Sequence, residues 1–254
     1  MKRLLKKWML RLTATGLLIT ALLLIIVLNP GLTYANKTTH NNYAIYHNKA
    51  LDPAFTVKLD QATELLKSSE IYNPTLHLDI CLNDGSKYPK LIRALRGQAF
   101  AFGYHNKVVL QGNTNVTGNY VELNGYRWNL IQLLAHEMTH CLQFKKLGFW
   151  KSKPIASLPN WKWEGYAEYV SRQNNDQKEL TTLITQYNTA DKNEWAIYFA
   201  DGTIAPREYF GYWILVKYCL DIKKMSYLQL LSDSTDEETI RQEMMSWYHS
   251  NKTI

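Results

Sequence analysis

Cysteine is scarce in this chain of 254 residues, which contains three: Cys81, Cys141 and Cys219. A small domain held together by disulfides would carry a larger, even set, so a disulfide scaffold is excluded and at most one bridge can form. Cys141 directly follows a histidine, and a free cysteine in a protein interior behaves as a small hydrophobic residue. We therefore expect all three cysteines to lie in the core and not to be metal ligands.

Internal repeats and low-complexity blocks are also missing. The hydrophobic content of 46% and the aromatic content of 13% predict one globular domain of ordinary size with a real core. The net charge of +7 would suit a nucleic-acid partner if the positive charges were gathered into a patch. Five of them instead lie within the first eleven residues, and the remainder of the chain is close to neutral. Nucleic-acid binding is therefore not expected.

Charge is absent from residues 12–28, which follow those five basic residues and read LTATGLLITALLLIIVL. An apolar run behind a basic flank is typical of a signal peptide or a signal-anchor helix, and about 17 residues is the short limit for crossing a bilayer. Ala35 offers a weak site for signal peptidase. We expect residues 1–35 to be a retained anchor or a cleaved signal peptide. Either way the positive-inside rule places the following domain outside the cytoplasm, in a single-pass membrane protein or a secreted protein.

The segment that follows the apolar run is polar and rich in Asn and Thr. This composition predicts a linker over residues 36–50 and a globular domain over residues 51–254. Within that domain, alternation of apolar and polar residues indicates strands, and apolar residues at three- and four-residue spacing indicate helices. The predicted strands cover residues 75–82, 98–103 and 107–110, and the predicted helices cover residues 60–69, 127–147, 161–172, 208–220 and 236–249.

One motif carries chemistry: His136 and His140 enclose Glu137 in the pattern H-E-x-x-H. On a helix, positions i and i+4 lie on one face one turn apart, so the two imidazoles can take two corners of a Zn²⁺ tetrahedron. Glu137 stands beside the first ligand and can reach a metal-bound water as a general base. The motif therefore predicts a catalytic zinc site.

The helix around this motif is apolar almost all round, apart from one narrow polar stripe. At 100° per residue the stripe comprises Asn129, Gln132, His136, His140 and Gln143. A helix that is apolar nearly all round is buried, and buried polar groups need partners. A metal ion would satisfy the two histidines.

A catalytic zinc needs a third protein ligand and an open position for water. Glu164 lies on the next predicted helix and is the natural third ligand. Glu168 is one turn further along the same face, from which it could orient a ligand imidazole by a hydrogen bond to its second nitrogen. For each glutamate the alternative is an ordinary carboxylate on a solvated helix face.

Residues 161–170 (WKWEGYAEYV) resemble the W-x-x-E-G-F/Y-A-x-Y segment of the gluzincins, zinc peptidases that combine H-E-x-x-H with a later glutamate ligand. The family includes the M1 aminopeptidases and the smaller peptidase MA-like domains. The resemblance implies that Glu164 is the third zinc ligand. Residues 209–220 (YFGYWILVKYCL) are similar to a family helix whose leading tyrosine stabilises the oxyanion. This role maps to Tyr209, and a phenol donor near zinc suits it; the alternative is an ordinary core or surface tyrosine.

The resemblance covers roughly residues 95–220, and one family motif is missing from it. That motif is G-x-M-E-N, which recognises the free amine of a substrate in exopeptidases and would stand upstream of the zinc helix. An endopeptidase is therefore the expected activity. Residues 98–101 could form an edge strand that pairs with an extended substrate by β-augmentation.

Together these patterns predict an α+β, zincin-like domain with a small mixed sheet before the zinc helix and mostly helices after it. The expected function is that of a zinc metallopeptidase acting on peptide or protein substrates. Two alternatives stay open. One is a non-catalytic, membrane-anchored zinc-binding or protein-interaction domain, for which Glu137 would be expendable. The other is a hydrolase of non-peptide amides, which would share the site.

Overall fold

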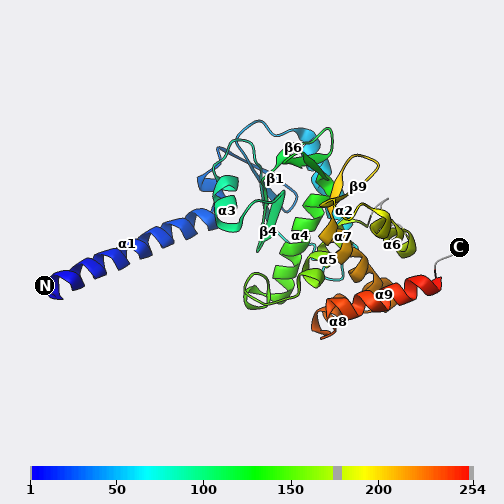
Figure 1. The fold of residues 1–254 in the computed structure, drawn as a ribbon. Coiled ribbons are helices and arrows are strands. Elements are labelled where there is room, and N and C mark those ends of the chain that lie inside the picture. The colour runs from blue at the N-terminus through cyan, green and yellow to red at the C-terminus, as the bar shows by residue number, and fades with distance from the viewer. Residues whose placement is uncertain (1, 174–178, 252–254) are drawn as a thin grey trace.

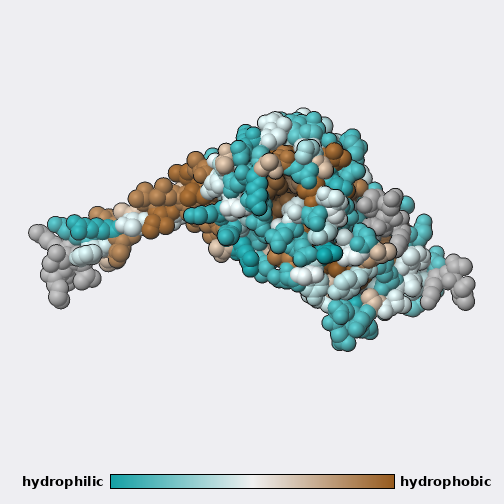
Figure 2. All heavy atoms as spheres, turned by 90° about the horizontal axis from the view of Figure 1, so that it is seen from above, coloured by the Kyte–Doolittle hydropathy of each residue, from teal (hydrophilic) through white to brown (hydrophobic). Residues whose placement is uncertain are grey.

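The N-terminal helix projects from the rest of the chain. The computed structural model describes residues 2–173 and 179–251, beginning with α1 (Lys2–Leu28). Within these residues α1 is the one helix long and apolar enough to cross a membrane, by length and composition; a signal sequence would have the same properties. Figure 1 shows it as a rod beside the domain. In Figure 2 the rod is mostly hydrophobic near the domain and hydrophilic toward its outer end, and the domain surface is mostly hydrophilic.

The first half of the domain is built around a mixed five-stranded sheet. Its central strands β2, β3 and β5 run parallel, whereas the edge strands β1 and β4 are antiparallel to their neighbours. All four residues of β5 are buried, as the apolar run in its sequence predicts. In spatial order the strands are β1 (Asn36–His40), β2 (Tyr43–His47), β3 (Leu78–Cys81), β5 (Lys107–Leu110) and β4 (Ala101–Tyr104).

The linker predicted over residues 36–50 is wrong, because these residues form β1 and β2 of the sheet. In β2 the side chains of Tyr43, Ile45 and His47 are buried, and those of Ala44 and Tyr46 are half-buried. The polar composition of β1 reflects its position at the sheet edge, where its side chains are half-buried or exposed. The domain therefore begins at about residue 36 and not at residue 51.

Smaller elements surround this sheet. Two helices, α2 (Pro53–Leu66) and α3 (Tyr88–Arg96), come from the connections between its strands. A three-stranded antiparallel sheet consists of β6 (Asn113–Asn115), β7 (Tyr120–Leu123) and β8 (Tyr126–Asn129), and a two-stranded one of β9 (Ala196–Tyr198) and β10 (Ile204–Pro206).

The central helix of the domain is α4 (Leu130–Leu147), which carries H-E-x-x-H. The Asn129 side chain accepts hydrogen bonds from the backbone N–H groups of Ile131 and Gln132, and so caps the start of the helix. Gly148 ends it with φ of 79°, a backbone conformation that favours glycine. In Figure 1, α4 lies between β4 on one side and α5 on the other, in agreement with its contacts.

The C-terminal half is mostly helical, and α5 and α7 pack closely. A Cβ atom at Gly165 of α5 would lie 2.6 Å from the carbonyl oxygen of Tyr212 in α7, so only glycine allows this approach. The α+β architecture predicted from the sequence is thus present. The helices after α4 are α5 (Asn160–Ser171), α6 (Leu180–Thr189), α7 (Arg207–Lys217) with a π-helical continuation (Tyr218–Ile222), α8 (Tyr227–Ser232) and α9 (Glu237–Asn251).

The three cysteines are free and fully buried, as expected. Cys141 and Cys219 belong to the main hydrophobic core, which is formed by α2, α4, α5, α7 and the sheets. Cys81 belongs to a smaller cluster beside α3, together with Tyr34 and Tyr88. The main core fixes α4 from several sides and so determines where its polar stripe faces.

Candidate metal centre

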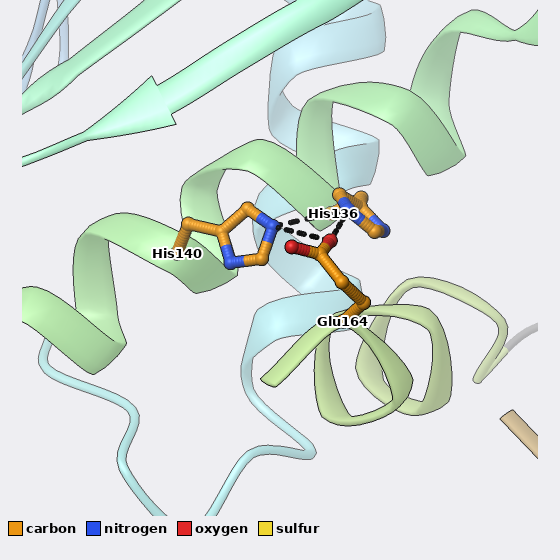
Figure 3. A group of neighbouring side chains, drawn as sticks. All are labelled: His136, His140 and Glu164. Carbon is orange, nitrogen blue, oxygen red and sulfur yellow. Dashed lines mark hydrogen bonds and ion pairs between the residues drawn. The ribbon is translucent and has the colours of Figure 1, made fainter. Parts of the chain in front are cut away.

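Three side chains from α4 and α5 converge on one point. The Nε2 atoms of His136 and His140 lie 3.1 Å apart, and they lie 3.3 Å and 3.2 Å from Oε2 of Glu164 (Figure 3). Within the described residues these side chains form a cluster that could hold a metal ion. Bonds of roughly 2.0–2.1 Å in a tetrahedral zinc site place the ligand atoms about 3.3–3.4 Å apart. The triangle therefore has nearly the size of one face of such a tetrahedron, and its two imidazoles and one carboxylate are ligands that several divalent metal ions accept.

The orientation of the His140 ring is fixed by Gln143, one turn further along α4. The Gln143 amide N–H group donates to the carbonyl oxygen of Trp163, at 3.0 Å, and to the hydroxyl of Tyr227, at 2.8 Å. A carbonyl can only accept, so the amide oxygen of Gln143 must face Nδ1 of His140, 2.7 Å away. Nδ1 therefore carries the proton, and Nε2 presents its lone pair to the centre.

The second nitrogen of the His136 ring faces a buried carboxylate. Nδ1 of His136 lies 3.1 Å from Oε1 of Glu168, an ion-pair contact that lacks the alignment of a good hydrogen bond. Arg172 donates its Nε–H to the other carboxylate oxygen of Glu168 at 2.5 Å, and its Nη1–H to Gln132 at 3.1 Å. Glu164, Glu168 and Arg172 follow one another at intervals of four, so a single face of α5 holds the centre. Glu168 thus lies where the predicted orienting role requires.

Negative charge is concentrated around the two histidines. Burial alone would lower the pKa of His136, but Glu164 and Glu168 raise it to about 10. Burial alone would raise the pKa of Glu164, but His140 and His136 lower it well below its ordinary value. In both cases the interaction between carboxylate and imidazole outweighs desolvation. The site therefore favours a positive charge between these groups, whether a proton or a metal ion.

Glu137 is buried beside this centre and lines the same cleft. Burial raises the pKa of its carboxyl group above the ordinary value, while the two histidines and a backbone hydrogen bond from Gly103 oppose the shift. A glutamate whose pKa is raised toward neutrality is better suited to accept a proton as a general base than an ordinary one.

Tyr209 stands at the start of α7 and also faces the cleft. Its ring is parallel to that of His136, with 5.8 Å between the ring centroids and 4° between the planes. Burial, followed by the charges of Glu164 and Glu137, raises the pKa of its phenol well above the ordinary value. The phenol therefore stays protonated and can act as a hydrogen-bond donor.

The centre opens into a cleft of about 1150 Å³. One wall is the edge strand β4, and the other walls are the loop after α4 and the start of α7. The edge strand expected over residues 98–101 begins about three residues later, at Ala101, and runs to Tyr104. The free side of β4 is available to a further strand.

Comparison with models of known protein families gives no match to this chain, and none of the curated proteins matches it either. The resemblance to gluzincins therefore rests on the sequence motifs alone. The structure brings together every predicted site residue: His136, His140, Glu164, Glu137, Glu168 and Tyr209.

Three further contributors were not predicted to act in the site. Gln143 stood on the polar stripe of the helix, three positions after His140, and that spacing was its signal. Arg172 could have been found as the cation four positions after Glu168. Gly103 approaches the backbone of Glu137, and no pattern in the sequence around it predicts this contact.

Proposed function

We propose that this chain is a zinc-dependent metallopeptidase of the gluzincin type, with a zincin-like catalytic domain. The observation that carries the proposal is the triangle of Nε2, Nε2 and Oε2 atoms with sides of 3.1–3.3 Å, next to the buried carboxyl group of Glu137. Its size and its donor atoms match zinc, and its position in a large cleft gives a substrate access.

In this proposal His136, His140 and Glu164 hold the metal. Bound zinc supplies Lewis acidity, which acidifies a water molecule and polarises the carbonyl group of the substrate. Glu137 takes the proton from the attacking water and delivers it to the leaving amine. Tyr209 donates its phenol proton in a hydrogen bond to the oxygen on which negative charge develops.

The supporting residues keep these groups in position. Gln143 keeps the proton of His140 on Nδ1, and Glu168 faces Nδ1 of His136 in the same way. Arg172 balances the charge of the buried Glu168, whose pKa lies below its ordinary value because these interactions outweigh desolvation. Both imidazoles are thereby held with Nε2 toward the centre.

The cleft fits an extended polypeptide. The free edge of β4 offers backbone hydrogen bonds to a substrate strand, and residues of β4 and of the start of α7 line the cleft together with Glu137. Since the chain has no G-x-M-E-N motif, we infer an endopeptidase. With α1 as membrane anchor or signal sequence, the domain would act outside the cytoplasm.

The test is the substitution Glu137→Gln, with Glu122→Gln as matched control. Glu122 lies in β7, where its side chain pairs with Arg127 at the surface, and it does not line the cleft. We expect stoichiometric zinc in the wild type and in both variants, and loss of casein hydrolysis in Glu137→Gln alone. A chelator should abolish the wild-type activity, and added zinc should restore it.

The outcomes separate the alternatives. Zinc binding with no hydrolysis of casein or small amides by the wild type would favour a binding domain. Hydrolysis of non-peptide amides alone would favour the other hydrolase. Unchanged activity in Glu137→Gln would remove the general-base assignment, and absence of zinc from the purified wild type would remove the proposal.

A further inference from the structure

The end of α1 is joined to the domain without a flexible linker. The carbonyl oxygen of Val27, in the last turn of α1, accepts a hydrogen bond of 2.6 Å from the hydroxyl of Tyr88 in α3. Pro30 and Tyr34 are already buried in the domain, and Ser86 donates to the carbonyl oxygen of Thr33 at 3.0 Å. If α1 crosses a bilayer, the domain surface around its end must therefore lie at the bilayer surface.

Beside this junction, α3 presents a row of cations. The exposed cations of the helix and its first flanking position are Lys87, Lys90, Arg93 and Arg96, and its exposed apolar side chains are Ala94 and Leu95, the latter 49% exposed. The sequence has no acidic residue between Asp84 and Glu122. Clusters of lysine and arginine next to a membrane helix attract anionic lipid headgroups.

A second segment that combines exposed cations with exposed apolar side chains follows α4. Its exposed apolar side chains are Phe149, 54% exposed, Trp150, 78% exposed, and Ile155, 45% exposed. The neighbouring lysines Lys145, Lys146 and Lys151 are also exposed, and no acidic residue occurs between Glu137 and Glu164. Exposed aromatic rings flanked by lysines are typical of segments that lie at a membrane–water interface.

Contacts place both segments on the flank of the domain that carries α1. Tyr88, which holds α1, shares a hydrogen bond of 2.7 Å with Tyr104 at the end of β4. The next residue, His105, contacts the ring of Phe144 at 6.1 Å between centroids, and Phe144 contacts Phe149 at 6.3 Å. In Figure 1 the loop after α4 lies on the side from which α1 approaches.

We propose that α3 and residues 145–155, here called the membrane-facing surface, rest on the anionic surface of the bilayer that α1 crosses. The cations contact headgroups, and the Phe149–Trp150 pair, whose rings lie 5.2 Å apart, enters the interface. Folding thus brings the basic residues of α3 and those of residues 145–155, which are far apart in the sequence, to one flank of the domain. Because Arg96 and Tyr104 also line the cleft, one end of the cleft opens at this surface. The proposal requires α1 in a membrane and is independent of the zinc chemistry.

The test uses the full chain reconstituted into vesicles with and without phosphatidylglycerol. A fluorophore is attached at Trp150→Cys or at Lys90→Cys. In controls it is attached at the exposed positions Val57→Cys on α2 or Gln242→Cys on α9, two helices that lie away from α1 in Figure 1. The native cysteines are fully buried and do not compete for the label. Lipid-borne quenchers report contact with the bilayer.

With phosphatidylglycerol present, we expect the labels at positions 150 and 90 to be quenched by lipid and the two controls to stay unquenched. Replacing Lys87, Arg93 and Arg96 by Gln should reduce the quenching at position 150, whereas replacing the exposed Lys49, Lys192 and Lys224 by Gln should leave it unchanged. High salt should act like the first triple substitution, because it screens exposed charges.

Two results would overturn the proposal. One is quenching at positions 150 and 90 no stronger than at the controls in phosphatidylglycerol vesicles. The other is binding of soluble polyphosphate that shields these labels from solvent, without any quenching by lipid. That result would mean that the surface binds an anionic polymer and not the bilayer. Neither lipid quenching nor shielding of the labels requires peptidase activity, so these measurements are independent of the test of the zinc site.

Discussion

Gly103 of β4 lies directly against the backbone of Glu137 in α4. A Cβ atom at position 103 would come within 2.1 Å of the Glu137 carbonyl oxygen and 2.7 Å of its carbonyl carbon. Backbone cannot move aside as the end of a side chain can, so the strand reaches the helix only because residue 103 is glycine. This contact brings the edge of the sheet to the proposed general base.

Gly103→Ala should therefore separate β4 from α4. We expect a loss of about 1–3 kcal/mol in the free energy of unfolding, the usual cost of overpacking, and weaker substrate binding along β4. The matched control is Gly211→Ala, whose Cβ would lie 3.3 Å from the hydroxyl oxygen and 3.5 Å from the ring of Tyr187, with no backbone atom nearer. Denaturant unfolding of both variants checks this, and equal stability of Gly103→Ala and the wild type would contradict it.

Gln143→Leu should weaken metal binding without touching a ligand. Nδ1 of His140 loses its acceptor, so the ring no longer has a fixed tautomer. Substitutions of this kind cost about 10–100-fold in metal affinity. Competition with a chromophoric chelator measures the effect, and Gln242→Leu on the exposed face of α9 is the control. An unchanged zinc dissociation constant would show that Gln143 does not position His140.

Tyr209→Phe should slow hydrolysis and leave zinc in place. Loss of one oxyanion donor typically lowers kcat by about 10²–10³, with little change in KM when the bond forms mainly in the transition state. Tyr218→Phe, at the far end of the same helical segment, serves as control, because its ring packs on Trp247. A kcat equal to that of the wild type would show that Tyr209 has a packing role and does not stabilise the oxyanion.

Glu168→Gln should show a pH-dependent loss of stability in the metal-free protein. Arg172 and then His136 outweigh desolvation and lower the pKa of Glu168 below its ordinary 4.5. The stabilisation by its charge is therefore fully present above pH 4.5 and is lost as the pH falls through the lowered folded-state value.

At pH 7 the variant should be less stable by about 3–5 kcal/mol, the cost of breaking a buried ion pair. The difference from the wild type should shrink in acid. Urea unfolding in chelator at pH 7 and at lower pH provides the measurement, and a difference that stays constant with pH would refute the assignment.

The sequence predicted which of the candidate site residues lie together better than it predicted the fold, because that grouping depends on local spacing. His136, Glu137 and His140 are placed by one helix, and helical geometry follows from the chain alone. Glu164 required a second helix and its W-x-W-E-G-Y context. Gln143 could be seen on the same stripe, but its partners Trp163 and Tyr227 come from α5 and α8, which no local pattern relates.

The strands β1 and β2 were missed because they are short and one is polar, so their stability comes from the sheet and not from their own sequence. The helix α3 was missed for a similar reason. It has nine residues and begins Tyr-Pro, and burial of Tyr88 and Ile92 against the end of α1 and β5 stabilises it. Contacts of this kind exist only in the folded molecule.

Through the hydrogen bond between Gln143 and Tyr227, the site depends on residues that are far apart in the sequence. Tyr227 is itself held by its backbone N–H, which donates to the carboxylate of Glu70 at 2.9 Å, so residues from three distant regions set the orientation of His140. During synthesis His140 cannot be held this way until α8 has left the ribosome. The centre is consequently completed late, and in a chain cut short before α8 Gln143 would keep its hydrogen bond to Trp163 but lose the one to Tyr227.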